Sequence, residues 1–466
     1  MSGSGRSEVP PKAQPELAPP PLHCTRCRRG GLRMRNEGLI CEACGSGFPM
    51  LGGIPWLFAE PQAALSEWQA RLRLLLADIE RRSHAARIAG ENAVAGSATA
   101  RRLQLLADAQ LAHARQLLAL LEPLQLTQQT AAYETLLALR TQLPADQGLT
   151  NYYANLHRDW CWGDAENRAA IDIVSRGLGN CLEDRDVLVL GAGAGRLAYD
   201  LHQALNPRYT LALDFNPMLL FVAREMFAGR ELELMEFPIA PSSIQNHAVT
   251  QRLRSPAESR AGLHAIAGDA LRPPVAPGSM GAVVTPWLVD VVGERLSDFA
   301  TRVNHLLADD AVWINFGSLT YTAGPLAERI SLEEAREILG AKGFEIERCD
   351  EDEIDYMRSP LSRHARRERA VSWLARKRAT AGEPVEHSHA PPWLVDATLP
   401  VPYGEELRHI VVATRVQAHL MSLIDGRRSL RDMAQLLTEQ RLLGAQEAES
   451  AVRRFLQRLH DDARQQ

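Results

Sequence analysis

The stretch Asp186-Val-Leu-Val-Leu-Gly-Ala-Gly-Ala-Gly-Arg-Leu-Ala-Tyr-Asp200 organises the chain, because its pattern indicates a buried strand, a three-glycine turn and the start of a helix. Gly191, Gly193 and Gly195 tolerate positive φ angles and let a ligand approach the backbone closely. The helix expected to begin near Arg196 presents unpaired N–H groups in its first turn. The stretch therefore predicts the floor of a nucleotide-type cofactor site.

Two further strand ends support this site. The apolar run Leu211-Ala-Leu-Asp214 ends in a carboxylate about twenty residues beyond the turn, where the ribose hydroxyls of a nucleoside would be held. A third apolar run is followed by Gly268-Asp269-Ala270, which we expect beside an adenine. The glycine spacing resembles motif I of class I S-adenosylmethionine-dependent methyltransferases more than an NAD site. The alternative is an ordinary strand-turn-helix junction, and the agreement of three strand ends favours the cofactor.

Composition bounds the class of protein. A chain of 466 residues with 45% hydrophobic content has room for several domains and a large core. Its net charge of -5 gives no global attraction to nucleic acid or acidic lipid, so we expect neither as a partner. No apolar run reaches the ~18 residues of a membrane helix, and the Pro-rich N-terminal stretch lacks a signal-peptide pattern. We therefore expect a cytosolic protein.

Four of the seven cysteines form a metal-ligand pattern. Cys24-Thr-Arg-Cys27 and Cys41-Glu-Ala-Cys44 are two CxxC pairs at zinc-site spacing. Because all four ligands, Cys24, Cys27, Cys41 and Cys44, are thiolates, no coordination position stays open for water, and we predict structural Zn²⁺. The following segment, Phe48 to Phe58, resembles the end of short zinc ribbons that accompany methyltransferases. The alternative is a redox dithiol pair or free core cysteines.

An Ala- and Leu-rich region follows the cysteines. Between Ala63 and Leu143, apolar residues recur at spacings of three and four, which predicts long amphipathic helices. Gly90 and Gly96 indicate the turn of a helical hairpin. We expect the leucine stripe to form core, with a partner-binding groove as the alternative.

The segment Arg158-Asp-Trp-Cys-Trp-Gly-Asp-Ala-Glu-Asn-Arg168 resembles the "RDW...G..ER" helix of carnosine N-methyltransferases, which methylate an imidazole nitrogen of a histidine-containing dipeptide. The resemblance spans roughly residues 150–378 and implies a class I core with a seven-stranded, mainly parallel sheet. It continues in order through Gly191–Ala198, Asn216–Leu220, Phe237-Pro238, Gly268-Asp269, Val284-Thr285, Asp290, Trp313–Tyr321, Gly343–Glu345 and Tyr356–Ser362.

This family resemblance assigns the catalytic side. Asp290 stands where the family has a carboxylate that accepts the N–H of one imidazole nitrogen and so leaves the lone pair on the other; the alternative is a helix cap. Trp287 would pack against the imidazole, with an ordinary core position as the alternative. Tyr356 would offer its phenol to the substrate or simply pack. Asn315 and Tyr321 are candidate substrate-binding groups.

The same resemblance assigns the cofactor side. Asp214 would bind the ribose hydroxyls, and Arg158 would hold the methionine carboxylate, unless it pairs on the surface with Asp159 or Glu166. Asn155 replaces a family glutamine one turn before that arginine. The predicted cofactor-binding residues are Asn155, Arg158, Gly191, Gly193, Gly195, Asp214, Asp269 and Ala270.

The chain departs from the family on the substrate side. Leu319-Thr-Tyr-Thr322 lacks the histidine of the family's "LLYH", and Arg363-His-Ala-Arg-Arg-Glu-Arg369 replaces a tyrosine-rich helix. The substrate can therefore be a dipeptide, a longer histidine peptide or another nitrogen nucleophile. The arginine cluster from Arg358 to Arg378 serves an acidic substrate or is a solvated basic face.

The C-terminal part is a separate small unit. Its segment Met421 to Ala434 resembles winged-helix domains that bind leader peptides in ribosomal-peptide modification, so a peptide or protein partner is possible there. A plain helical cap or a dimerisation domain is the alternative.

We therefore predict an S-adenosylmethionine-dependent N-methyltransferase of α/β class that acts on a histidine imidazole. The alternatives are a methyltransferase of another small nitrogen or oxygen nucleophile, or a non-catalytic adaptor with a degenerate core. The predicted organisation is a disordered lead (1–21), a zinc ribbon (22–60), a helical hairpin (61–148), the methyltransferase domain (149–380), a linker (381–389) and a helical or winged-helix unit (390–466).

Overall fold

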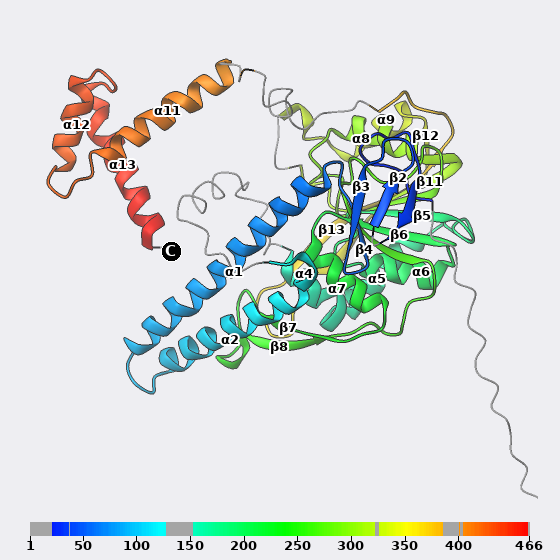
Figure 1. The fold of residues 1–466 in the computed structure, drawn as a ribbon, viewed down its shortest axis with the longest axis horizontal. Coiled ribbons are helices and arrows are strands. Elements are labelled where there is room, and N and C mark those ends of the chain that lie inside the picture. The colour runs from blue at the N-terminus through cyan, green and yellow to red at the C-terminus, as the bar shows by residue number, and fades with distance from the viewer. Residues whose placement is uncertain are drawn as a thin grey trace, which may run out of the picture. The chain divides into compact units, whose positions relative to one another are not determined.

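The computed structural model describes residues 21–36, 38–126, 152–321, 326–384, 400 and 404–464. Within the chain, Met1–Val385 and Glu386–Gln466 form two compact units, and each is treated by itself (Figure 1). Residues 1–20 of the predicted lead, 127–148 of the predicted hairpin and 385–389 of the predicted linker lie outside the described residues.

The first unit is built on a mainly parallel sheet, as predicted. Its seven core strands follow the order β9-β6-β5-β10-β11-β13-β12. The first five run parallel, and β13 and β12 are antiparallel to their neighbours. Parallel strands end at one common edge, which in such sheets holds the ligand. The strands are β5 (Asp186–Leu190), β6 (Tyr209–Asp214), β9 (Leu263–Gly268), β10 (Met280–Pro286), β11 (Leu307–Gly317), β12 (Phe344–Tyr356) and β13 (Arg366–Lys377).

Apolar side chains cover both faces of this sheet. Along β5, Val187 and Val189 join one hydrophobic cluster, whereas Leu188 and Leu190 join the other, because successive side chains of a strand point to opposite faces. No described helix is long and apolar enough to span a membrane. The core helices are α4 (Tyr153–His157), the π-helical turn η2 (Arg158–Trp162), α5 (Asp164–Ser175), α6 (Arg196–Leu205), α7 (Pro217–Phe227), α8 (Leu296–Leu306), α9 (Leu332–Ala341) and the short turns η3 (Gln245–His247) and η4 (Leu326–Glu328).

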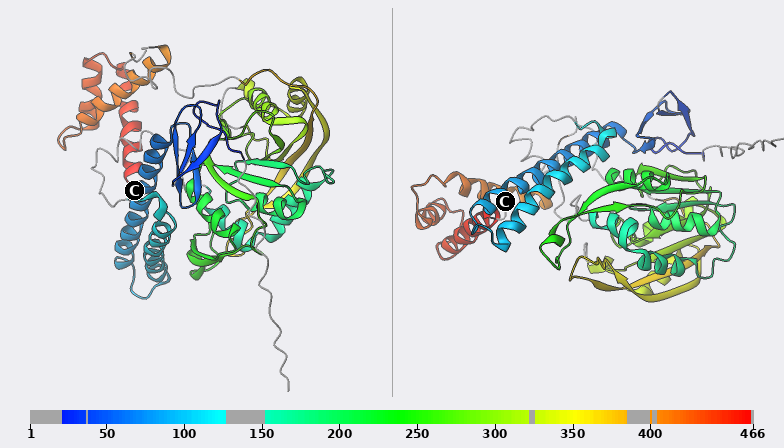
Figure 2. Two further views of the ribbon diagram at one scale, coloured as in Figure 1. Left: turned by 45° about the vertical axis from the view of Figure 1, so that its right-hand side comes forward. Right: turned by 90° about the horizontal axis from the view of Figure 1, so that it is seen from below.

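The helical hairpin is present and is part of the core. Helices α1 (Pro61–Glu91) and α2 (Ala98–Leu120) lie side by side (Figure 2), and the turn η1 (Glu122–Leu124) follows them. Leu72 and Leu117 are fully buried and belong to the same hydrophobic cluster as the core helices. The leucine stripe is therefore core, as expected. Helix α2 also contacts the two-stranded sheet of β7 (Leu232–Glu236) and β8 (Val249–Leu253).

The four-cysteine segment extends the central sheet. Strands β1 (Leu32–Arg35), β2 (Gly38–Cys41), β3 (Gly47–Leu51) and β4 (Ile54–Leu57) are antiparallel to one another, and β4 then pairs in parallel with β9. In the part of the chain that the structure describes, the central sheet thus has eleven strands. The segment had been expected as a separate domain, whereas the structure makes it the edge of the main sheet.

The second unit is helical over residues 404–464. Helices α11 (Glu405–Ser422), α12 (Leu430–Glu439) and α13 (Ala445–Arg464) pack around Leu437 and Val452. The Asp-Gly turn before α12 is stabilised by Asp425, whose Oδ1 accepts hydrogen bonds from the N–H groups of Arg427 and Arg428, and Ser429 then caps the helix. These residues include no strand, so the described part shows no wing, and leader-peptide binding stays a prediction.

Truncation of the hairpin core should be costly. We expect Leu117→Ala to lower the free energy of unfolding by about 2–5 kcal/mol, because Leu117 is fully buried. Val94→Ala, at a position that is 80% exposed, should change it by less than about 0.5 kcal/mol. Urea denaturation followed by circular dichroism measures both, and equal losses would show that the hairpin is not part of the core.

Candidate functional site

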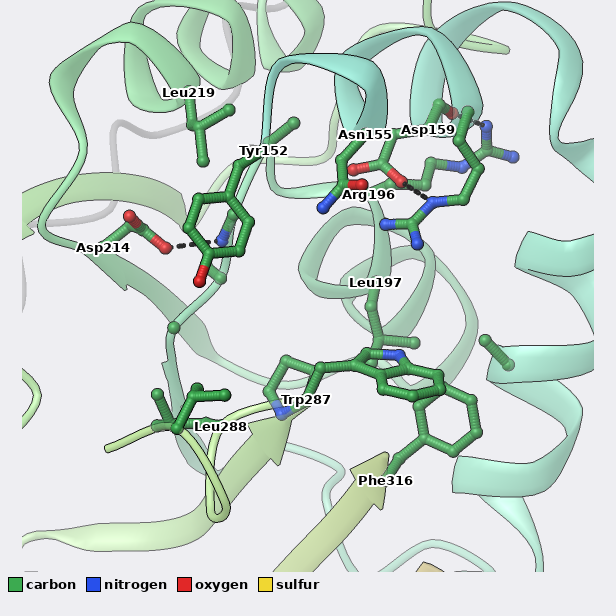
Figure 3. A pocket seen from close by; sticks show the side chains of 18 of the residues that line it. Tyr152, Asn155, Asp159, Arg196, Leu197, Asp214, Leu219, Trp287, Leu288 and Phe316 are labelled. Atoms are coloured by element: carbon green, nitrogen blue, oxygen red, sulfur yellow. Dashed lines mark hydrogen bonds and ion pairs between the residues drawn. The ribbon is translucent and has the colours of Figure 1, made fainter. Parts of the chain in front are cut away.

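A cavity of about 420 Å³ opens at the carboxyl edge of the parallel strands (Figure 3). Its floor comes from the ends of β5, β6, β10 and β11, and further walls come from α4, η2, β12 and β13. In Figure 3, Tyr152 and Asn155 lie across the opening from Trp287 and Leu288. The part of the cavity around Asp214, where the sequence predicts the cofactor, is called the cofactor side, and the part around Asp290, where the sequence predicts the methyl acceptor, is called the acceptor side.

The glycine turn and Asp214 form the cofactor side. Gly191 and Gly193 have φ angles of 69° and 59°, and a Cβ added to Gly193 would meet no atom within 4 Å, so the backbone there is open to a ligand. Asp214 Oδ2 accepts a hydrogen bond from Gly193 N at 2.8 Å, and Oδ1 accepts one from Asn216 N at 2.8 Å. Each carboxylate oxygen keeps a lone pair for a hydroxyl donor. Burial raises the pKa of Asp214 to about 6.

Two predicted cofactor residues do not line this cavity. Gly195 is the N-cap of α6 with a φ of 82°, and its Cβ would lie 2.6 Å from the ring of Phe227, so this glycine serves helix packing. Asp269 turns back to accept a hydrogen bond from Leu271 N at 2.8 Å. Its neighbour Ala270 does line the cavity. The structure therefore brings Ala270, and not Gly195 or Asp269, to the site.

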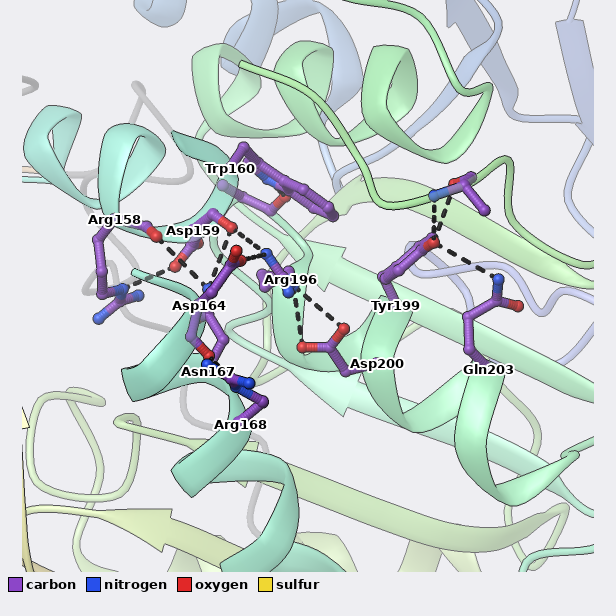
Figure 4. A network of polar contacts seen from close by, with 12 residues as sticks. Arg158, Asp159, Trp160, Asp164, Asn167, Arg168, Arg196, Tyr199, Asp200 and Gln203 are labelled. Atoms are coloured by element: carbon purple, nitrogen blue, oxygen red, sulfur yellow. Dashed lines mark hydrogen bonds and ion pairs between the residues drawn. The ribbon is translucent and has the colours of Figure 1, made fainter. Parts of the chain in front are cut away.

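A polar network joins η2 to the glycine turn (Figure 4). Trp160 Nε1 donates to the carbonyl of Ala194 at 2.9 Å. The guanidinium of Arg196 lies 5.3 Å from the centre of the Trp160 ring and donates to the carbonyl of Asp159 at 2.6 Å. Because Asp159 and Arg196 also line the cavity, this network fixes one of its walls. Arg196 directly follows the glycine turn, but the motifs did not indicate that it lines the cavity.

Arg158 lines the cavity with its charge already paired. Nε donates to Asp159 Oδ1 at 2.7 Å and Nη1 donates to Glu166 Oε1 at 3.2 Å. The alternative prediction, that Arg158 pairs with Asp159 or Glu166, is therefore confirmed. The pairs lie in the cavity wall and not on the surface, since the Arg158 side chain is 13% exposed. Asn155, one turn earlier, lines the cavity as well.

Asp290 occupies the acceptor side. Its Oδ2 accepts hydrogen bonds from Ser318 Oγ at 2.6 Å and from Thr320 N at 2.8 Å. Its Oδ1 is buried and has no partner among the described residues. Helix α8 begins at Leu296, with Arg295 as its N-cap, so Asp290 does not cap this helix. A buried acceptor without a donor is rare, and here it belongs to a residue that lines the cavity.

Aromatic rings enclose the space beside Asp290. Trp287 adopts a φ of 50°, uncommon outside glycine, while its N–H donates to the carbonyl of Phe316 at 2.7 Å. The Trp287 ring lies 5.6 Å from Phe316 and 4.8 Å from Tyr356, measured between ring centres. All three line the cavity. Strained backbone of this kind is often found at functional sites.

The two predicted substrate-binding residues lie outside the cavity lining. Asn315 is fully buried within the sheet, where Oδ1 accepts a hydrogen bond from Thr285 Oγ1 at 2.9 Å. Since strand side chains alternate, Phe316 faces the cavity and Asn315 faces the opposite side. Tyr321 has a buried hydroxyl without a partner among the described residues, and burial together with the charge of Asp290 raises its pKa.

Arg366 and Glu368 are cavity residues that the motifs did not reveal. Arg366 Nε lies 2.7 Å from Glu368 Oε1, and its guanidinium lies 4.5 Å from the centre of the Tyr356 ring. The segment had been compared with a helix, whereas it belongs to strand β13, so residues 366 and 368 share one face. Arg367 pairs instead with Asp355 of the neighbouring strand at 3.4 Å. In the sequence, the charged residues Arg366 and Glu368 stand two positions apart, which is the spacing of one face of a strand.

The four predicted metal ligands converge. The Sγ atoms of Cys24 and Cys44 are 3.8 Å apart, those of Cys27 and Cys41 are 3.6 Å apart, and all four lie within 4.8 Å of one another. One cluster of four thiols fits tetrahedral coordination of a metal ion. The N–H groups of Cys27 and Cys44 point at the sulfurs of Cys24 and Cys41, at 3.4 Å in each case.

Comparison with known proteins points to one family. Residues 147–379 match the family model described as carnosine N-methyltransferase. The relative described as carnosine N-methyltransferase unmet, from Drosophila melanogaster, is 24% identical over 214 residues, which cover 42% of this chain and 46% of that protein. The chain thus spans less than half the length of this curated relative.

Two of the solved structures with similarity are described as methyltransferases. A putative S-adenosylmethionine-dependent methyltransferase from Listeria monocytogenes is 12% identical and covers 46% of this chain and 99% of that chain, with a TM-score of 0.32. Phosphoethanolamine N-methyltransferase 2 from Haemonchus contortus, in complex with S-adenosyl-L-methionine, is 16% identical and covers 44% of this chain and 43% of that chain, with a TM-score of 0.29.

Removal of the Asp214 charge should weaken cofactor binding. We expect Asp214→Asn to raise the Kd for S-adenosylhomocysteine about tenfold to 100-fold, because charge-assisted hydrogen bonds to the ribose are lost. Asp172→Asn, at an exposed position of α5, is the control and should leave the Kd unchanged. Isothermal titration calorimetry measures both, and equal affinity in wild type and Asp214→Asn would remove Asp214 from the site.

The pH dependence of binding follows from the same carboxyl group. The pKa of Asp214 is raised to about 6, so the group is ionised above this pH and becomes protonated below it. Affinity for S-adenosylhomocysteine should therefore be constant above about pH 7 and fall as the pH drops through 6. Asp214→Asn should flatten this profile. A wild-type profile without a step near pH 6 would contradict the assignment.

Proposed function

The chain belongs to the carnosine N-methyltransferase family, and on this premise we propose that it is an S-adenosylmethionine-dependent methyltransferase that methylates an imidazole nitrogen of a histidine in a dipeptide, a peptide or a protein segment. The observation that carries the proposal is that Asp290, a residue of the cavity wall, has a buried Oδ1 without a partner among the described residues. An imidazole N–H is a donor of the right kind for that oxygen.

The cofactor side fits S-adenosylmethionine. When bound, this cofactor supplies a methyl group on a positively charged sulfur. Asp214 would accept hydrogen bonds from its ribose hydroxyls, the open backbone at Gly191 and Gly193 would pass beside it, and Ala270 would contact the adenine. Arg158 would hold the carboxylate, with Asp159 and Glu166 fixing its orientation.

Asp290 would select the nucleophile. Ser318 Oγ and Thr320 N hold Oδ2, so Oδ1 is aimed by two hydrogen bonds. By accepting the N–H of one ring nitrogen, Oδ1 leaves the lone pair on the other nitrogen. The carboxylate would stabilise the positive charge that the ring gains with the methyl group, and it would take up the N–H proton from the ring.

The aromatic wall would position the ring and exclude water. Trp287, Phe316 and Tyr356 present flat apolar surface to the space beside Asp290. Methyl transfer depends mostly on holding two atoms about 3 Å apart and in line, in a site that water does not enter. These three rings supply that constraint.

Arg366 and Glu368 would bind the terminal carboxylate and the terminal ammonium group of a small peptide. Arg366 Nε lies 2.7 Å from Glu368 Oε1, and the guanidinium would also donate hydrogen bonds to the carboxylate of the substrate. The carboxylate of Glu368 would receive the ammonium group of the substrate. The pair replaces groups that the family has on its substrate side, and it favours a substrate with free termini.

Zn²⁺ bound to Cys24, Cys27, Cys41 and Cys44 belongs to the same proposal, and its support is the single cluster of four thiols. Zinc there would be structural, because four protein ligands leave no position for a substrate. The cluster lies at the edge strands of the sheet.

Two other functions make different predictions. A methyltransferase of another nitrogen or oxygen nucleophile would bind the cofactor but need no acceptor at Asp290 Oδ1. A non-catalytic adaptor would leave the cavity without affinity for the cofactor. Incubation with labelled S-adenosylmethionine and a panel of imidazole dipeptides, histidine peptides and other amines separates all three.

Asp290→Asn tests the proposed function directly. The amide is nearly isosteric but presents no negative charge, so we expect kcat to fall by about 100-fold or more while the Kd for S-adenosylhomocysteine stays unchanged. Asp309→Asn, at an exposed position of β11, is the matched control and should keep full activity. Full activity of Asp290→Asn, measured by product mass spectrometry, would refute the imidazole assignment.

The role of Arg366 is tested against its neighbour. We expect Arg366→Gln to raise KM for a histidine dipeptide about tenfold to 100-fold and to leave KM for the carboxamide form of the dipeptide unchanged, because only the free acid needs the guanidinium. Arg367→Gln removes an equal charge on the other face of β13 and should change neither value. If Arg366→Gln raised KM equally for the free acid and the carboxamide, the result would contradict a role of Arg366 in binding the substrate carboxylate.

A further inference from the structure

The four-cysteine segment is joined to the cofactor side of the cavity by backbone pairing. Trp56 and Leu57 of β4 pair in parallel with Ala267 and Gly268 of β9. Leu57 is fully buried, and a Cβ at Gly268 would lie 3.3 Å from its carbonyl oxygen, so the two strands meet closely. Two residues beyond Gly268, Ala270 lines the cavity. Strand β4 of the four-cysteine segment therefore helps to position the end of β9.

A second connection holds the loop that follows β9. The N–H of His23 donates to the carbonyl of Pro274 at 2.8 Å. Cys24, the adjacent metal ligand, is 2% exposed and shares a hydrophobic cluster with Leu271 and Val275. The loop that starts at Ala270 is thus backed by the residues that would bind the metal.

A third connection runs through α1. Trp56 Nε1 donates to the carbonyl of Pro61 at 3.0 Å, at the start of this helix. Farther along α1, the ring of Trp68 lies 5.8 Å from that of Phe215, between ring centres. Phe215 directly follows Asp214 and lines the cavity. All three connections therefore reach the side assigned to the adenosine part of the cofactor.

We expect the segment to gain order from a bound metal ion. Its strands have four or five residues each, toward the short end of the usual range of strand lengths. In small sites of this kind, the free energy of metal binding is also free energy of folding. Loss of the ion should loosen Cys24 and, through His23 and β4, the backbone at Ala270.

We propose that the four-cysteine segment is a positioning element for the adenosine half of the cofactor site, so that metal loading sets the affinity for the cofactor. Segment 22–57 acts through the backbone at Ala270 and through Phe215, and it does not touch the reacting atoms. The proposal rests on the assignment of S-adenosylmethionine to the cavity, and it does not depend on the identity of the methyl acceptor.

Calorimetry on the full chain tests the proposal without any methyl acceptor. Cys44→Ser removes the exposed ligand without a cavity in the core, and it should lose stoichiometric zinc and raise the Kd for S-adenosylhomocysteine at least tenfold. Cys349→Ser, a half-buried cysteine outside the cluster, is the control and should keep both values. Wild-type protein treated with a chelator should show the same loss, and added Zn²⁺ should restore its affinity.

Two further measurements separate positioning from general stabilisation. The loss of affinity should be as large for 5′-methylthioadenosine as for S-adenosylhomocysteine, because the connections reach only the adenosine side. His23→Pro removes the N–H bonded to Pro274 but no metal ligand, so it should keep its zinc and still raise the Kd several-fold.

The outcomes are distinct. A zinc-free protein whose melting temperature falls, but whose Kd below the transition is unchanged, would overturn the positioning role and leave the proposed function standing. A zinc-loaded wild type that binds no S-adenosylhomocysteine would overturn the cofactor assignment and this inference together.

Discussion

The common direction of β6, β5 and β10 is the constraint on which the site depends. Parallel pairing brings Asp214, the glycine turn and the loop that carries Asp290 to one edge, although they are far apart in the chain. Backbone groups then fix the two carboxylates. Gly193 N and Asn216 N hold Asp214, and Thr320 N helps to hold Asp290. The site is thereby arranged before any ligand enters.

The N-terminal regions are part of this arrangement. Helix α1 packs into the same hydrophobic cluster as the core, and β4 adds its strand to β9. The π-helical turn η2 is tied to the glycine turn through Trp160 and Arg196. Residues of η2 thus form one wall of the cavity. The four-cysteine segment supports another wall, at Ala270, through the pairing of β4 with β9.

The sequence predicted those parts of the fold and the site that depend on residues close together in the chain. The glycine turn, Asp214 at a strand end and the two CxxC pairs each follow from spacing within a short stretch. Asn315 was misplaced because a motif does not state which face of a strand a residue occupies, and its neighbour Phe316 takes the cavity side. Arg366 and the β4–β9 pairing were missed because both depend on strand partners that lie far away in the sequence.

The central claim is that a histidine imidazole binds against Asp290 Oδ1 with its second nitrogen directed at the cofactor. A crystal structure of the protein with S-adenosylhomocysteine and a histidine dipeptide tests it most directly. We predict one ring nitrogen at about 2.7–3.0 Å from Asp290 Oδ1 and the other facing the cofactor sulfur. An imidazole bound elsewhere, or an Asp290 Oδ1 paired with the protein itself in that complex, would contradict it.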